Sequence, residues 1–139
     1  MPPGLLLAVG YGLLLPVIAI LHVRHQRWRE SGAILGTIGG ASVVVLGIVA
    51  AVAPVATIPA LFVRGVWWWT IGKMWWETAL LPRPLGAATM ALALGAFALA
   101  AAAAPLALEP AGIASADRAV LGAWAIALSV AVWGSLDAR

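Results

Sequence analysis

Four long stretches of this 139-residue chain contain no charged side chain, and they fix the class of fold available to it. They cover residues 3–21, 32–63, 85–108 and 119–136. A helix that crosses a bilayer needs ~20 consecutive apolar residues, and each stretch is about that long or longer. Hydrophobic residues make up 64% of the chain and charged residues 9%, so little remains for a soluble domain. The sequence therefore predicts an all-α, polytopic transmembrane bundle forming a single domain over residues 1–139.

Five spans are expected, at about residues 4–22, 32–53, 60–81, 85–108 and 118–136. Pro16 predicts a kink in the first span, because proline lacks the N–H that continues the helical hydrogen bonds. Ser115 or Asp117 is the expected cap of the last span. The first span is expected to be retained, since the chain begins Met-Pro-Pro without the positive charge of a cleavable signal.

Residues 60–81 allow two interpretations, because they carry Arg64, Lys73 and Glu77 together with five tryptophans. They form either a fifth span or a helix lying in the membrane interface, which would leave four spans. With five spans, the basic segment 24–29, Arg83 and Arg139 fall on one side of the membrane. Lysine and arginine favour the cytoplasmic side, so we favour five spans with the N-terminus outside and the C-terminus inside. The composition is typical of a bacterial inner-membrane protein.

Small residues recur at four-residue spacing in two of the expected spans. They are Gly32, Gly36 and Gly40 in the second span, and Ala119, Ala123, Ala127 and Ala131 in the last. Small residues let helix backbones approach closely in lipid, where the hydrophobic effect adds little to helix association. Both ridges predict helix packing, and the spacing leaves open whether the partner helix is internal or belongs to another molecule.

A polar stripe in residues 60–81 is the leading candidate for a functional site. Thr70, Lys73 and Glu77 fall on one helix face, and Lys73 and Glu77 are spaced to form an ion pair. An intramembrane lysine usually faces a bundle interior or a cavity, where the stripe could line a passage. Alternatively, Lys73 extends to the cytoplasmic headgroups and Glu77 neutralises it, which is the more common arrangement.

Two histidines, His22 and His25, stand at the inner end of the first span and offer a single axial ligand to a haem or pigment. Neighbours on one helix cannot ligate both faces of a macrocycle, so no cofactor is predicted. The adjacent cluster of Arg24, Arg27, Trp28 and Arg29 suits anionic lipid headgroups or serves as a topology signal.

Catalytic and metal-binding chemistry finds little support in the composition. The chain has no cysteine, which removes thiolate metal sites, disulfides and cysteine nucleophiles. It has no GxSxG or HExxH motif and no expected strand to precede a phosphate-binding loop. We therefore expect no enzyme activity, no metal site and no nucleic-acid partner, with the net charge of +3 serving membrane topology instead.

The segment Glu77-Thr-Ala-Leu-Leu-Pro-Arg-Pro-Leu-Gly86 resembles a hairpin of uncharacterised bacterial multi-spanning membrane proteins. In those proteins a tryptophan- and leucine-rich helix ends in an LPRxLG turn, and the next span starts at once. Leu81, Pro82, Arg83, Leu85 and Gly86 carry the resemblance, while Pro84 departs from the bulky residue usual there. The resemblance implies that residues 60–81 span the membrane with Arg83 inside, and it implies no activity.

Three functional hypotheses follow from the sequence. The first is a non-enzymatic accessory or assembly subunit of a larger membrane complex, with other membrane subunits or further copies of itself as partners. The second is a homo-oligomeric small carrier or channel that uses the Lys73–Glu77 stripe. The third, more distant, is a pigment- or haem-binding subunit that uses His22 or His25.

Overall fold

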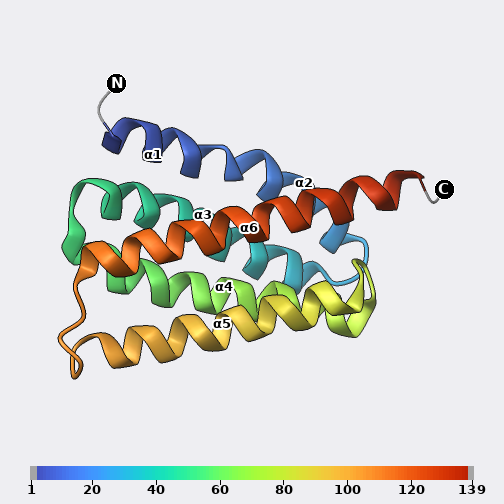
Figure 1. Ribbon diagram of the computed structural model, residues 1–139. Coiled ribbons are helices and arrows are strands. Elements are labelled where there is room, and N and C mark those ends of the chain that lie inside the picture. Colours follow the sequence, from blue (N-terminus) through green and yellow to red (C-terminus); the bar gives the residue numbers. More distant parts are fainter. Residues whose placement is uncertain (1–2, 138–139) are drawn as a thin grey trace.

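The computed structural model describes residues 3–137, and this part of the chain folds into a bundle of five helical rods (Figure 1). The first rod consists of α1 (Pro3–Gly12) and α2 (Leu14–Gln26). The others are α3 (Glu30–Val52), α4 (Thr57–Thr78), α5 (Arg83–Ala103) and α6 (Pro110–Asp137), with a short 3₁₀ helix, η1 (Pro54–Ala56), before α4. The all-helical fold predicted from the sequence is confirmed.

Within residues 3–137, four of the rods are long and apolar enough to cross a membrane: residues 4–26, 30–52, 83–103 and 110–135. The rod formed by α4 does not meet that criterion on composition. It nevertheless lies lengthwise among the others, in contact with α3, α5 and α6 (Figure 1). The axis of α4 is therefore aligned with those of the neighbouring spans, antiparallel to α3 and α5 and parallel to α6 (Figure 1). This arrangement favours the five-span interpretation over a helix lying in the membrane interface.

The first rod bends where Pro16 predicts a kink. The helical assignment breaks at Leu13, between α1 and α2. Pro16 supplies no N–H to the carbonyl of Gly12, one turn earlier, so the hydrogen-bond ladder is interrupted there. The bend lets α1 and α2 both pack along α3.

Several helix boundaries differ from the expected ones. The last helix begins at Pro110 rather than at residue 118, so Asp117 lies ~10 Å inside α6 and neither Ser115 nor Asp117 is a cap. Proline suits the first turn of a helix, where no intrahelical N–H bond is needed. The fourth span ends at Ala103 rather than at 108, and the first helix continues to Gln26 instead of ending at His22. Residues 60–81 are shifted to Thr57–Thr78.

Most of the aromatic bulk lies on the inner face of α4. Trp67, Trp68 and Trp75 are buried, and all three pack around Trp124 of α6, with ring centroids 5.4 to 6.3 Å apart. Trp69 and Trp76, by contrast, face outward. The close spacing of the tryptophans along the sequence therefore reflects two opposite faces of one helix rather than two membrane interfaces.

The glycine ridge of α3 packs inside the bundle. A Cβ on Gly32 or Gly40 would lie 2.8 Å from side chains of α4 or α2, respectively. The carbonyl of Gly36 accepts a hydrogen bond from the indole of Trp67 at 2.8 Å. In this structure the ridge packs against α2 and α4, so its partners are internal.

The hairpin between α4 and α5 closes on two facing glycines. A Cβ on Gly72 would lie 2.9 Å from the carbonyl oxygen of Gly86, and a Cβ on Gly86 would lie 2.9 Å from that of Gly72. Ala79 ends α4 in the left-handed conformation, with φ of 52°, and Leu81 is buried beneath the turn. The segment that resembles an LPRxLG hairpin thus brings two backbones into direct contact.

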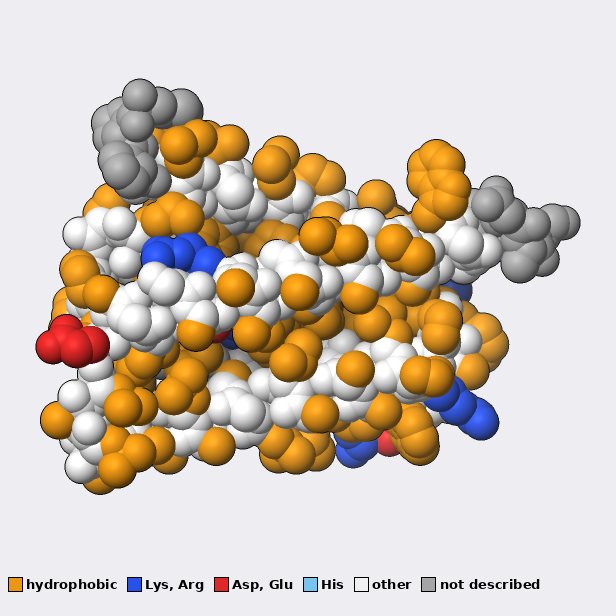
Figure 2. All heavy atoms as spheres, in the orientation of Figure 1, with side chains coloured by type: hydrophobic (Ala, Val, Ile, Leu, Met, Phe, Trp, Pro, Cys, Tyr) orange, Lys and Arg blue, Asp and Glu red, His pale blue; other side chains and the backbone are white. Residues whose placement is uncertain are grey.

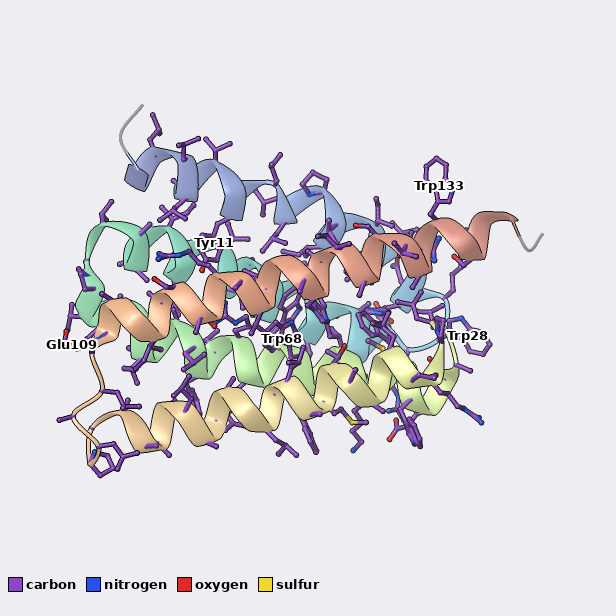
Figure 3. The ribbon with its side chains drawn as sticks, in the orientation of Figure 1. Tyr11, Trp28, Trp68, Glu109 and Trp133 are labelled. Carbon is purple, nitrogen blue, oxygen red and sulfur yellow. The ribbon has the colours of Figure 1, made fainter. Side chains whose placement is uncertain are left out.

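Charged side chains gather at one end of the bundle. The α2–α3 connection, the α4–α5 turn and the end of α6 share this end (Figure 1). It holds Arg27, Arg29, Lys73, Glu77 and Arg83. Trp28 and Trp133 project from the same end (Figure 3). The opposite end holds η1 and the loop that contains Glu109, while Arg139 lies outside the described residues.

Candidate functional site

An ion pair is buried between α4 and α6. Arg64 pairs through its Nη2 with the Asp117 carboxylate, and the two side chains are only 2% and 11% exposed. The guanidinium also lies over the Trp68 ring, 5.1 Å from the ring centroid. A charged group deep in a membrane bundle is costly unless it is paired, so each partner makes the burial of the other possible.

Tyr11 and Thr57 complete a polar centre around this ion pair. We use this name for Tyr11, Thr57, Arg64, Asp117 and Arg118. Tyr11 lies next to the guanidinium, and its ring fills the space into which a Cβ at Gly47 would project. Thr57 is 4% exposed, and its hydroxyl has no hydrogen-bond partner among the described residues. Thr57, Tyr11, Asp117 and Arg118 line a cavity of about 20 Å³, enough for one water-sized group.

Polar contacts hold α6 to the bundle along its length. The Arg64–Asp117 ion pair holds its first half, and near its middle the Trp124 indole donates to the Thr89 hydroxyl of α5 at 3.0 Å. Near its end, Arg24 of α2 donates to the Ser135 hydroxyl at 3.1 Å. Helices in lipid associate through van der Waals packing and interhelical hydrogen bonds, so these polar contacts add to packing in setting the position of α6.

Two apolar crevices lie on either side of α6. One has a volume of about 230 Å³ and separates α6 from α1 and α2, with Leu6, Leu14 and Leu121 among its lining residues. The other has a volume of about 180 Å³ and separates α6 from α5, with Leu92, Leu99 and Val120 in its walls. The first reaches Tyr11 and Arg118, and the second reaches Trp68 and Asp117. Both crevices therefore adjoin the polar centre.

The predicted polar stripe of α4 lies on the outer face of the bundle. Lys73 and Glu77 do form the expected ion pair, at 3.8 Å, and Arg29 adds a second one to Glu77 at 3.8 Å. Lys73 is 58% exposed and Glu77 44%, and neither lines the cavities described above. Thr70 lies one turn earlier and donates to the carbonyl of Val66. This arrangement matches a lysine near the helix end that reaches toward headgroups.

The two histidines are engaged in hydrogen bonds inside the bundle. His25 is buried, and its Nε2 accepts a hydrogen bond from the Trp75 indole at 2.8 Å. His22 bonds through Nδ1 to the Thr37 hydroxyl at 2.7 Å. The space beside both rings has no room for a water molecule. Axial ligation of a haem by His25 would require breaking its bond to Trp75 and separating α2 from α4.

In both the basic cluster and the alanine ridge, most of the predicted residues are exposed and one is turned toward the bundle. Arg27, Trp28 and Arg29 are exposed, whereas Arg24 is turned toward α6 through its bond to Ser135. On α6, Ala119, Ala123 and Ala127 are exposed and Ala131 is half-buried. The buried face of α6 is formed instead by bulkier residues, namely Ile113, Leu121, Trp124 and Leu128.

The pairing of Arg64 with Asp117 was not predicted from the sequence. In the sequence, Arg64 stood out only as one of three charged residues in residues 60–81, and Asp117 only as a possible cap of the last span. One sequence signal does point to its burial: Arg64 shares a helix face with Leu61, Trp68, Ile71 and Trp75, which are bulky residues at helical spacing. A basic residue among such neighbours indicates an inward side chain that needs an acidic partner.

Comparison of this chain with known protein families, curated proteins and solved structures gives no match.

Proposed function

We propose that this protein is a non-enzymatic integral membrane subunit that works by docking to other membrane helices through the exposed face of α6. The observation that carries this proposal is the contrast between the two small-residue ridges. The glycines of α3 pack against α2 and α4, whereas Ala119, Ala123 and Ala127 face out of the bundle. A ridge of small residues provides little contact area toward lipid but allows a neighbouring helix to approach closely.

The use of the polar side chains supports a structural role over a catalytic one. His25, Trp67 and Trp124 each make hydrogen bonds that link helices. The Arg64–Asp117 ion pair likewise links α4 to α6. A subunit of this kind belongs in the bacterial inner membrane, oriented with the basic end of the bundle in the cytoplasm. Its N-terminus then lies outside and its C-terminus inside.

The test is the recovery of partners from native membranes in a mild detergent. An Ala123→Leu, Ala127→Leu double variant places bulky side chains on the ridge and should reduce the yield of co-purified membrane subunits at least fivefold. Val45→Leu, an exposed change on α3, should leave the yield unchanged. If the double variant recovers the same partners at wild-type levels, this face of α6 is not the docking surface.

A homo-oligomeric carrier or channel is the second candidate, and it rests on the outward position of Lys73 and Glu77. A passage lined by this stripe would have to lie between copies of the chain, because both side chains point away from the bundle. It requires the chain to purify alone as an oligomer and Lys73→Ala to abolish flux into liposomes. A monomeric chain that recovers larger partners argues against it.

A further inference from the structure

The crevice between α1 and α6 ends at the positively charged side chain of Arg118. It runs along α6 from Arg118 toward Ala125, a distance of ~10 Å, and its lining is mostly leucine and glycine. Figure 2 shows it as a recess of hydrophobic side chains between α1 and α6, with basic atoms at its left end. The apolar part of the crevice has room for far more than one water molecule, but its lining offers a water few hydrogen-bond partners. In a bilayer, a lateral opening of this kind is filled by hydrocarbon.

The charges at the head of the crevice favour an anionic occupant. The Asp117 carboxylate is already neutralised by Arg64, so Arg118 leaves this region with one positive charge in excess. Arg118 makes no ion pair within residues 3–137, and its Nη2 donates only to the Ser115 hydroxyl, at 3.2 Å. An arginine at this depth reaches toward the headgroup level, where phosphate is its preferred partner.

An unsatisfied hydroxyl at the same place points to a ligand independently. The small cavity lined by Thr57, Tyr11 and Arg118 adjoins the crevice, because Leu7, Tyr11 and Arg118 line both. The buried Thr57 hydroxyl has no partner among the described residues, and a buried donor left unpaired is unfavourable. A phosphate ester oxygen would accept from it.

We propose that this crevice binds one anionic phospholipid, with an acyl chain between α1 and α6 and its phosphate held by Arg118. The opposite walls support the fit. Gly10 of α1 and Gly122 of α6 both line the crevice, and a Cβ on either would meet nothing within 4 Å. The site is separate from the exposed Arg27–Arg29 cluster, which lies at the other end of the bundle.

Native mass spectrometry of the full chain, titrated with dioleoyl phosphatidylglycerol or dioleoyl phosphatidylcholine in mild detergent, tests the proposal. The wild type should bind one phosphatidylglycerol at least tenfold more tightly than phosphatidylcholine. Arg118→Gln should lose this preference, with a Kd for phosphatidylglycerol about tenfold higher, because a charge-assisted hydrogen bond is removed. Arg83→Gln, which removes one positive charge from the exposed α4–α5 turn, should leave the Kd unchanged.

Two further variants separate filling of the crevice from misfolding. Gly122→Leu and Gly10→Leu fill the crevice from opposite walls, and both should abolish the bound phosphatidylglycerol while retaining wild-type circular dichroism. Gly134→Leu makes the same change on an open part of α6 and should bind normally. Equal binding of both lipids, unchanged affinity in Arg118→Gln, or a protein dimer whose formation Gly122→Leu blocks would overturn the proposal.

Discussion

Arg64 and Lys73 lie on the same helix, yet the protein encloses one and leaves the other exposed. The difference follows from their neighbours. Arg64 lies on the face that carries Trp68 and Trp75, while Lys73 shares the outer face with Trp69 and Trp76. The enclosed arginine needs a counter-charge within the bundle, whereas the exposed lysine, close to the helix end, reaches water and headgroups directly.

Replacing Asp117 with asparagine should destabilise the bundle by about 3–5 kcal/mol, because the Arg64 guanidinium would remain buried without its counter-charge. The free energy of unfolding in mixed detergent and dodecyl sulfate micelles measures this loss. The double variant Arg64→Met, Asp117→Leu removes both charges and should recover at least half of it. Arg83→Gln, at an exposed arginine, should change stability by less than about 0.5 kcal/mol. If the losses of stability in the single variants Arg64→Met and Asp117→Leu simply add in the double variant, the pair is not coupled.

Ala79→Gly should stabilise the protein by about 1 kcal/mol. Ala79 adopts φ of 52°, a conformation that is unfavourable for alanine and free of strain for glycine. The same unfolding assay measures the gain. Ala98→Gly is the matched control, since it lies exposed inside α5 and should cost roughly 0.5–1 kcal/mol. A loss of stability at both positions would contradict the left-handed end of α4.

At the scale of whole helices, α4 shows that contacts within a helix could be predicted from the sequence, whereas contacts between helices could not. The i, i+4 spacing of Lys73 and Glu77 correctly predicted their ion pair, because that contact depends only on local helix geometry. The side of the bundle that the pair faces depends on where α3, α5 and α6 pack. The Arg64–Asp117 contact joins residues from different helices, and no local pattern specifies such a pairing. The packing role of Gly36 was predictable from its spacing, but its partner Trp67 was not.

Helix ends were the least predictable elements. The sequence contains no charge between Leu85 and Leu108, so hydropathy alone extended the fourth span to 108. The chain instead turns after Ala103, passing through Ala107 in the left-handed conformation before Pro110 starts α6. Pro105 is the local signal that hydropathy misses: it has no N–H to continue the helix, and its ring disfavours the helical conformation at the residue before it.

The crossing of α4 and α5 should tolerate no side chain at its closest point. Gly72→Ala or Gly86→Ala should each cost about 1–3 kcal/mol, because the new Cβ would meet backbone atoms that cannot rotate away. The two losses should be less than additive in the double variant, since both changes widen the same contact. Gly95→Ala, also on α5, faces open space and should cost nothing. Equal effects at positions 86 and 95 in the unfolding assay would contradict this crossing.

At the scale of the whole molecule, the central position of α4 determines which loops share a side of the membrane. With α4 crossing, the α2–α3 connection and the α4–α5 turn lie together at the basic end (Figure 1). If α4 lay in the interface, they would lie on opposite sides. The number of spans can therefore be determined by measuring from which side of the membrane each of these two loops is accessible.

Single cysteines placed in the loops should label from two distinct sides. The natural chain contains no cysteine, so each introduced thiol is unique. In right-side-out vesicles, an impermeant maleimide should label Val55→Cys and Glu109→Cys and leave Arg27→Cys and Arg83→Cys unlabelled until the vesicles are opened. Opposite behaviour of positions 27 and 83 would exclude a spanning α4. Labelling of positions 27 and 83 together, with 55 and 109 protected, would keep five spans but reverse the orientation.

The tryptophan cluster gives the protein an optical property. The rings of Trp75 and Trp124 are stacked, with 9° between their planes and 6.3 Å between their centroids, although they belong to α4 and α6. Stacked indoles in a fixed geometry couple electronically and give the folded bundle a near-ultraviolet dichroic signal that is lost when side-chain packing is lost. The chain thus carries a built-in spectroscopic reporter for the docking of its last helix, readable without any added label.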